Sequence, residues 1–229
     1  MSSFDLDNFN ERLKSAGKPD KVEWTRKIIN TQMPVLAVQA KDIAALVKSV
    51  ASEDLEAYLE SEDFRHYENT IVYAKVMSKL KDFDKFVCYL NKLMPAMDNW
   101  ATVDAIEWRV TDANRAQMQD LCEKLVVCPH AFSRRTGVRI LFEGLDDENF
   151  GFALDVVRRL KQEGEYYVNM CVAWLLCEGV IKQRARTLEF LESGNVNEFV
   201  LRKTVSKCRD SFRVSDEDKQ YLKTLLKAN

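Results

Sequence analysis

Residues 165–181 read EYYVNMCVAWLLCEGVI, and their apolar side chains are too dense for a solvent-facing surface. The stretch is one of a series, from residues 4–17 to residues 215–228, in which apolar residues recur with helical period. Strand signals are nearly absent, because the chain has no Asn-Gly or Asp-Gly hairpin turn and no sustained period-2 alternation. The pattern predicts an all-α protein of about thirteen helices, with Trp174 most simply a core residue.

The helical segments pair with a spacing of roughly 35–40 residues, which is typical of a degenerate helical-repeat solenoid. The alternative is an irregular globular helical bundle. No linker rich in Gly, Pro or Ser divides the chain, which has 7 Gly and 4 Pro among 229 residues. We therefore expect a single domain over residues 1–229.

The bulk composition is that of a soluble globular protein, with 46% hydrophobic and 31% charged residues. No apolar run approaches the roughly 20 residues that span a bilayer, and the N-terminal segment is acidic where a signal peptide would be basic. The six cysteines contain no CxxC pair, and only two histidines could complete a metal site. We expect a cytoplasmic protein with no membrane contact, no metal and no cofactor, in which most cysteines are small buried residues.

Residues 99–108, NWATVDAIEW, place a carboxylate between two indoles. On a helix, Trp100, Asp104 and Trp108 would lie one turn apart on a single face. Asp98 or Asn99 could cap this helix, and Asp104 could then simply complement the positive end of the helix dipole. From spacing alone this structural interpretation is favoured over a functional one.

Two groups of basic residues could contact phosphate, although the net charge is only −2. The first lies in SRRTGVR, and the second precedes the start of the last helix. Solvated helix faces explain both groups at least as well. The members are Arg134, Arg135 and Arg139 in the first group and Arg202, Lys203, Lys207, Arg209 and Arg213 in the second.

Taken in order, several segments resemble the bacterial DNA alkylation repair family, the AlkD-like alkylpurine DNA glycosylases. The similarity runs from about Trp24 to Leu222 and rests on order and spacing more than on any one segment. The segments are TQMPVLAVQAKDIAAL, WATVD, SRRTGVRILF, YVNMCVAWLL and KTVSKCRDSFRVSDEDKQYL. The family usually has Gly and Pro where this chain has Ala37 and Lys41, a tryptophan at Phe132 and an alanine at Gly137.

The resemblance implies a right-handed α-solenoid of HEAT-like repeats whose concave, basic face binds double-stranded DNA. It also implies hydrolysis of the N-glycosidic bond of purines alkylated at N3 or N7, as the first step of base excision repair, by a monomer. Trp100 and Asp104 match the family's active-site helix, Arg135 its arginine near the DNA backbone, and Trp174 the second tryptophan of the cleft. Trp108 matches no functional position, so packing is its expected role.

The residue types suit this chemistry. A purine alkylated at N3 or N7 is cationic and leaves as a neutral base, while the sugar gains oxocarbenium character. A fixed carboxylate such as Asp104 stabilises that cation and can orient a water, and indole faces add cation–π attraction. The alternative is a helical-repeat module without catalysis that binds branched or damaged DNA, or a protein.

Overall fold

The computed structural model describes residues 4–228. These residues form fourteen α-helices and five short 3-10 helices, and no strand occurs among them. The prediction of an all-α protein is confirmed. The chain divides into two compact units, of which the first ends at Trp108 and the second begins at Arg109. The expectation of one domain over the whole chain stays a prediction.

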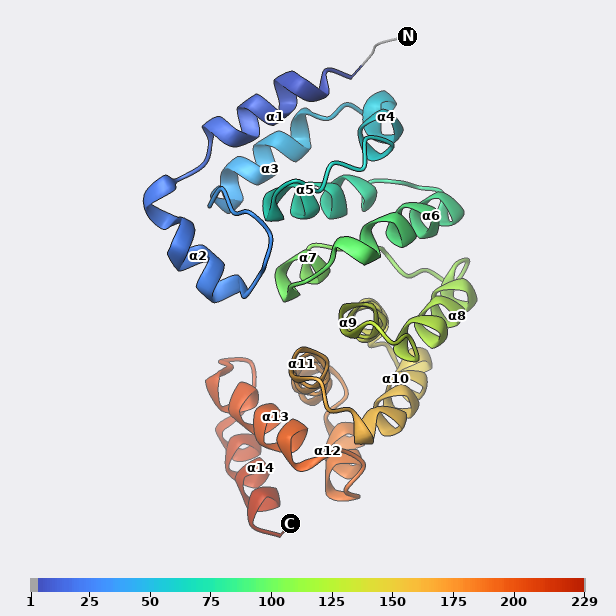
Figure 1. Cartoon of the computed structure of the whole chain (residues 1–229). Coiled ribbons are helices and arrows are strands. Elements are labelled where there is room, and N and C mark those ends of the chain that lie inside the picture. The colour runs from blue at the N-terminus through green and yellow to red at the C-terminus, as the bar shows by residue number, and fades with distance from the viewer. Residues whose placement is uncertain (1–3, 229) are drawn as a thin grey trace. The chain divides into compact units, whose positions relative to one another are not determined.

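The first unit is built around the central helix α5. Nine of the eleven residues of α5 are buried, and α3, α4, α6 and α7 pack against it (Figure 1). Helix α1 packs against α3, and its Phe9 ring lies 5.2 Å from the ring of Tyr58 in α4. The helices are α1 (Leu6–Ser15), α2 (Val22–Ile29), α3 (Ala40–Ser49), α4 (Leu55–Leu59), α5 (Tyr67–Met77), α6 (Phe83–Leu93) and α7 (Trp100–Asp104), with 3-10 turns at Pro19–Lys21, Ser52–Asp54 and Met94–Ala96.

The second unit is built around α11, the helix predicted at residues 165–181. Ten of its seventeen residues are buried, with α9 and α13 packed along it, α8 against α9 and α14 against α13. The helices are α8 (Arg115–Val126), α9 (Ala131–Ile140), α10 (Asp147–Arg159), α11 (Tyr166–Lys182), α12 (Arg184–Glu192), α13 (Glu198–Asp210) and α14 (Asp216–Ala228), with 3-10 turns at Leu141–Gly144 and Leu160–Gln162.

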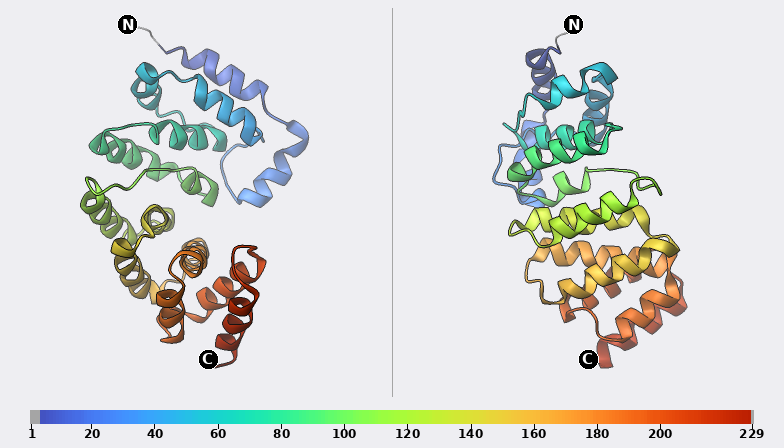
Figure 2. Two further views of the ribbon diagram at one scale, coloured as in Figure 1. Left: turned by 180° about the vertical axis from the view of Figure 1, so that it is seen from behind. Right: turned by 90° about the vertical axis from the view of Figure 1, so that its right-hand side faces the viewer.

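Successive helices of the second unit lie stacked on one another, as the right-hand view of Figure 2 shows. Side-chain caps begin several helices in both units, because an aspartate or asparagine oxygen accepts a backbone N–H of the first turn. These caps are Asp5, Asp82, Asn99, Asp146 and Asn197. The stacking is consistent with an α-solenoid, whereas the right-handed twist and the concave face stay predictions.

The helix predicted over NWATVDAIEW is much shorter than expected. Helix α7 ends at Asp104, so Trp108 lies beyond it and not on its face. Beyond Ala105 the chain is held by other contacts. Ile106 is buried, Glu107 N–H donates to Ser78 Oγ (2.9 Å), and the Trp108 ring lies 4.5 Å from that of Phe86 in α6. The expectation of one stripe with three residues was wrong, whereas Trp108 packs as expected.

Among residues 4–228, none of the helices combines the length and the apolar character that crossing a membrane requires.

Candidate functional site

Trp100 and Asp104 are the first and last residues of α7 and lie one turn apart on the same face. Both side chains are half-buried. The cap of this short helix is Asn99, whose Oδ1 accepts the backbone N–H of Thr102 at 2.9 Å. Asp104 therefore lies at the negative end of the helix dipole, where a carboxylate is disfavoured. The helix begins at the Asn99 cap, as predicted, but it ends at Asp104, so the interpretation of Asp104 as a dipole complement is wrong.

Helix α7 is held on α5 by a buried polar network. Asn99 Oδ1 also accepts the Thr102 hydroxyl (3.2 Å), which lies 2.6 Å from the hydroxyl of Thr70 in α5. Asn99, Thr102 and Thr70 are completely buried. Buried polar groups that are fully hydrogen-bonded fix one arrangement of their elements. The network therefore gives the helix that carries Trp100 and Asp104 a defined position in the first unit.

The indole of Trp100 contacts the end of α2. Its Nε1–H donates to the backbone oxygen of Ile28 at 3.4 Å, a long hydrogen bond. The two residues are separated by 72 positions in the chain. Sequence reasoning did not identify Ile28, because no local pattern indicates a partner at that separation.

In the second unit, Trp174 lies in a cluster with Phe142 and Arg139. The rings of Trp174 and Phe142 are 4.6 Å apart, and the Arg139 guanidinium carbon lies 5.9 Å from the Trp174 ring and 5.3 Å from the Phe142 ring. Arg139 also pairs with Glu143 at 3.1 Å. Trp174 is half-buried, unlike its helix neighbours Ala173 and Leu175. It thus combines packing against Phe142 with partial exposure next to a cation.

Arg135 and Arg134 have different environments although they are neighbours in α9. The Arg135 side chain is buried, and its Nη1 donates to the backbone oxygen of Tyr167 at 2.6 Å. Arg134 donates to both carboxylate oxygens of Glu163 (2.7 and 3.2 Å) and to the backbone oxygens of Cys128 and Pro129. The hydrogen bond to Glu163 raises the pKa of Arg134. Both arginines therefore contribute to the packing of α9 in addition to any contact with DNA.

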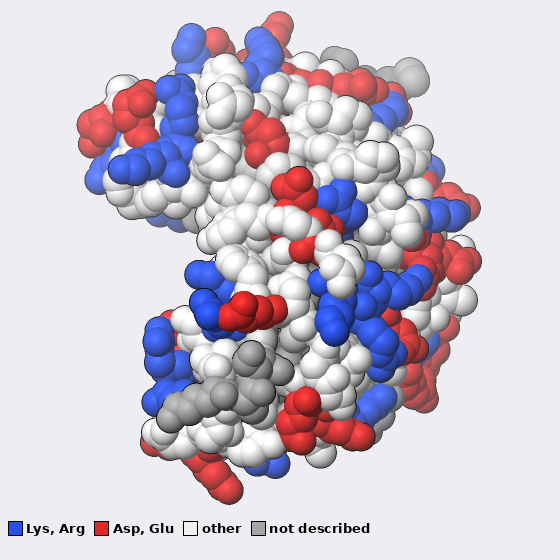
Figure 3. Space-filling model, turned by 60° about the horizontal axis from the view of Figure 1, so that its bottom comes forward, with Lys and Arg blue, Asp and Glu red and all other residues white. Residues whose placement is uncertain are grey.

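Three arginines of the second basic group pair with carboxylates of the same unit. Arg202 pairs with Glu198, Arg209 with Asp210 (2.9 Å) and Arg213 with Glu178. The Lys203 amine lies 5.5 Å from the Phe199 ring centre. Basic and acidic side chains lie interspersed on the face drawn in Figure 3. The pairs of Arg202 and Arg209 are exposed on both sides and therefore contribute little to stability, whereas the Glu178 side chain that pairs with Arg213 is largely buried.

The structure brings Trp100 together with Asp104 in the first unit and Trp174 with Arg139 in the second. Arg139 was predicted as a phosphate contact, and its position beside Trp174 was not foreseen. That residues of both units form one cleft stays a prediction.

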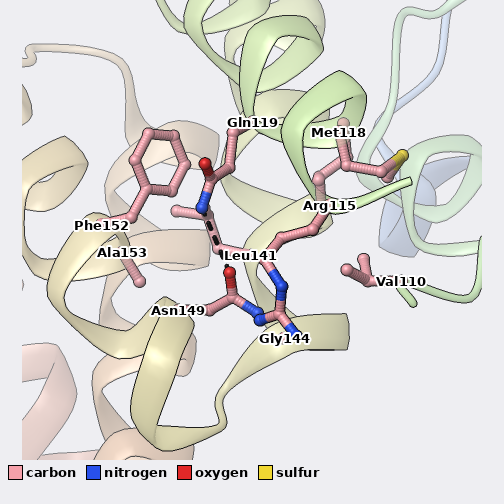
Figure 4. Close-up of a pocket in the computed structure, with 10 residues that line it drawn as sticks. Val110, Arg115, Met118, Gln119, Leu141, Gly144, Asn149, Phe152 and Ala153 are labelled. Carbon is pink, nitrogen blue, oxygen red and sulfur yellow. Dashed lines mark hydrogen bonds between the residues drawn. The ribbon is translucent and has the colours of Figure 1, made fainter. Parts of the chain in front are cut away.

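A small, mostly apolar pocket in the second unit contains no predicted catalytic residue. It lies between α8, α10 and the 3-10 turn Leu141–Gly144, where Gln119 Nε2 donates to Asn149 Oδ1 at 3.1 Å (Figure 4). Arg115 at its edge pairs with Asp112, Asp146 and Glu148. Its polar groups are thus engaged with one another, and the pocket offers no free chemical group that suggests catalysis.

The cysteines are mostly structural. Cys122, Cys171, Cys177 and Cys208 are buried, as predicted, whereas Cys88 is exposed. Burial raises the pKa of the Cys122 thiol to about 12, which leaves it protonated and unreactive near neutral pH. Among the residues that the structure describes, no group of three His, Cys, Asp or Glu side chains could hold a metal ion.

Comparison with known proteins adds one finding. The model of a family described as "DNA alkylation repair enzyme" matches residues 9–209, which is most of the chain. No curated protein matches the chain. The family resemblance inferred from the order of the segments is confirmed.

Proposed function

The chain belongs to the DNA alkylation repair enzyme family, and from this premise we propose that it is a monofunctional DNA glycosylase. Its substrates are purines carrying a positive charge from alkylation at N3 or N7 in duplex DNA. The reaction hydrolyses the N-glycosidic bond and begins base excision repair. It needs no metal or cofactor, because the cationic purine is already a good leaving group.

The position of Asp104 carries this proposal. The carboxylate is half-buried at the C-terminal end of a short helix, where the helix dipole disfavours a negative charge, with an indole one turn away. As the glycosidic bond breaks, positive charge develops on the sugar, and a nearby carboxylate stabilises that charge more strongly in a cleft of low polarity than in water. The carboxylate also orients the water that attacks C1′.

Trp100 and Trp174 supply the walls of the cleft in this proposal. Indole faces exclude water from the sugar and attract the developing cation. Arg134, Arg139 and the basic residues of α13 and its C-terminal flank contact phosphates and set the position of the strand. Arg135 is buried and donates to the Tyr167 backbone oxygen, so its contribution in this proposal is to hold α9 in position. The protein acts as a cytoplasmic monomer on double-stranded DNA.

The test is release of 7-methylguanine from methylated duplex DNA under single-turnover conditions. Asp104→Asn keeps the size of the side chain and removes its charge, so the rate constant should fall at least about 100-fold while DNA affinity stays nearly the same. Asp84→Asn, which changes an exposed aspartate of α6, is the matched control and should release base at the wild-type rate. Unchanged release by the Asp104 variant would refute the assignment of the carboxylate.

A binding module without catalysis is the second candidate. The net charge of −2 and the carboxylates that pair with Arg202, Arg209 and Arg213 weaken attraction to a polyanion, so they favour the form of this candidate that binds a protein. In that case the wild-type protein binds branched or damaged DNA, or a protein, and releases no base.

A further inference from the structure

Helix α2 lies beside Trp100 but is poorly anchored by packing. Of its eight residues only Ile29 is buried, and Trp24 and Ile28 are 65% and 47% exposed. Its extensive contacts are confined to the 3-10 turn that leads into it. Elements with few buried apolar contacts open locally at low free energy. The position of α2 must therefore depend on polar contacts at its ends.

The carboxylate of Asp98 makes those contacts at the C-terminal end. Its Oδ1 and Oδ2 accept the Thr31 hydroxyl at 2.7 and 2.8 Å, and Oδ2 accepts the backbone N–H of Gln32 at 2.7 Å. Oδ1 also accepts the side-chain amide of Asn99 at 2.9 Å. Thr31 is 2% exposed. One carboxylate thus joins the residues that follow α2 to the cap of α7.

The remainder of the segment between α2 and α3 is held by a second carboxylate. Glu68 in α5 accepts the backbone N–H groups of Leu36 (3.0 Å), Ala37 (2.6 Å) and Val38 (3.3 Å). Loss of the Asp98 contacts would therefore free the end of α2 and residues 31–32 and leave residues 36–38 in place. This division makes the contribution of Asp98 separable from the stability of the first unit.

We propose that Asp98 is a positioning residue, which holds the end of α2 against Trp100 through Thr31 and Gln32. The Trp100 indole then keeps its contact with Ile28 and its orientation beside Asp104. Because Asp98 directly precedes the cap residue Asn99, it also holds the first turn of α7. The consequence for base release rests on the proposed glycosylase function, whereas the structural role does not.

Asp98→Asn tests the proposal directly, because both oxygens of the Asp98 carboxylate accept hydrogen bonds: Oδ1 from Thr31 and Asn99, and Oδ2 from Thr31 and Gln32. Whichever way the new amide turns, its NH2 group faces a donor, either the Gln32 N–H or the Asn99 amide. Thr31→Val keeps the shape of the side chain and removes the hydroxyl, which donates to Asp98 and also accepts the Met33 N–H at 3.1 Å. The matched control is Asp63→Asn, because Asp63 likewise accepts hydrogen bonds in a loop of the first unit, from Asn10 and Arg65, away from α2.

The first readout is hydrogen exchange followed by mass spectrometry. In Asp98→Asn and Thr31→Val, amides of residues 26–33 should exchange about tenfold faster, with α5 unchanged, because loss of a charged hydrogen bond raises local opening. The effect of the double variant should be smaller than the sum of the two single effects, since both variants disrupt the hydrogen bond between Thr31 and Asp98. Unchanged exchange at residues 26–33, or equal acceleration throughout the first unit, overturns the proposal.

The second readout is the indole N–H signal of Trp100 in NMR spectra of the whole protein, with Trp108 and Trp174 as internal references. It should shift and exchange faster in both variants and not in Asp63→Asn. Single-turnover release of 7-methylguanine should fall about tenfold with DNA affinity within about twofold, because geometry is lost and binding is not. If the wild-type protein releases no base, the glycosylase function fails, while exchange and NMR still decide the role of Asp98.

Discussion

Ala37 has a backbone conformation that an alanine rarely adopts. Its φ is +58°, in the left-handed region, and the residue is buried where Glu68 accepts its N–H. A side chain with a Cβ costs about 1–2 kcal/mol there, whereas glycine costs none but loses more entropy on folding. Ala37→Gly should therefore raise the free energy of unfolding by about 0.5–1 kcal/mol, measured by urea denaturation.

The matched variant at this position is Ala37→Val, which places a β-branched side chain in the same strained conformation. It should lower the free energy of unfolding, because branched residues tolerate positive φ least. If Ala37→Gly is less stable than the wild type, the packing of the Ala37 methyl group stabilises the protein by more than the strained backbone conformation of this residue destabilises it.

The residues of the candidate site were predictable to different degrees. Asp104, Trp100, Arg135 and Trp174 came from the family resemblance, because spacing alone favoured a structural role for Asp104. Of the residues that position them, the cap Asn99 was predicted from its residue type, whereas the contacts between distant segments could not be predicted. Asp98 and Thr31 are separated by 67 positions, and only the tertiary fold brings them together.

At the level of the elements, the ion pair between Arg134 and Glu163 connects α9 with the turn before α11. Burial alone would raise the pKa of Glu163, but the hydrogen bonds and charge of Arg134, together with the backbone N–H groups of Glu165 and Gly164, lower it below its ordinary value of 4.5. When folding lowers the pKa of a carboxyl group, the group stabilises the folded protein at pH values above its pKa in the unfolded chain. This stabilisation is lost as the pH falls through the pKa of the folded state. Stability should therefore decline on acidification below about pH 4.5.

Glu163→Gln isolates that contribution. The variant should be less stable than the wild type near neutral pH, and the difference should shrink in denaturation curves recorded at decreasing pH. Glu165→Gln, an exposed neighbour, should follow the wild-type curve. A constant difference at all pH values would assign the loss to the Gln side chain and not to the ion pair.

Sequence periodicity predicted the ends of some helices and not of others. The apolar stretch 165–181 was predicted within one residue at each end, because α11 is buried along most of its length. The stretch 99–108 was predicted as one helix and forms five helical residues. Its second half is held by Ser78 and Phe86, and a helix that ends for tertiary reasons carries no local stop signal.

At the level of the whole molecule, the balance of charge poses a problem for DNA binding. The chain carries 34 basic and 36 acidic residues, and several arginines predicted to meet phosphate already have carboxylate partners. Nonspecific affinity for DNA comes from phosphates neutralised with release of counterions. An arginine that stays paired with its carboxylate neutralises no phosphate, so each such pair lowers the number of phosphate contacts.

Removing one such partner should strengthen DNA binding. Glu198→Gln releases Arg202, and the slope of log affinity against log salt should become steeper by up to about 0.9, the value for one more phosphate contact. Glu23→Gln, which releases Arg26 of α2 from a comparable exposed pair, should leave the slope unchanged, since Arg26 is not among the predicted contacts. The measurement is fluorescence anisotropy of labelled duplex over a range of salt concentrations. An unchanged slope in Glu198→Gln would place α13 outside the DNA interface, and absence of salt-sensitive affinity in the wild-type protein would favour a protein partner instead.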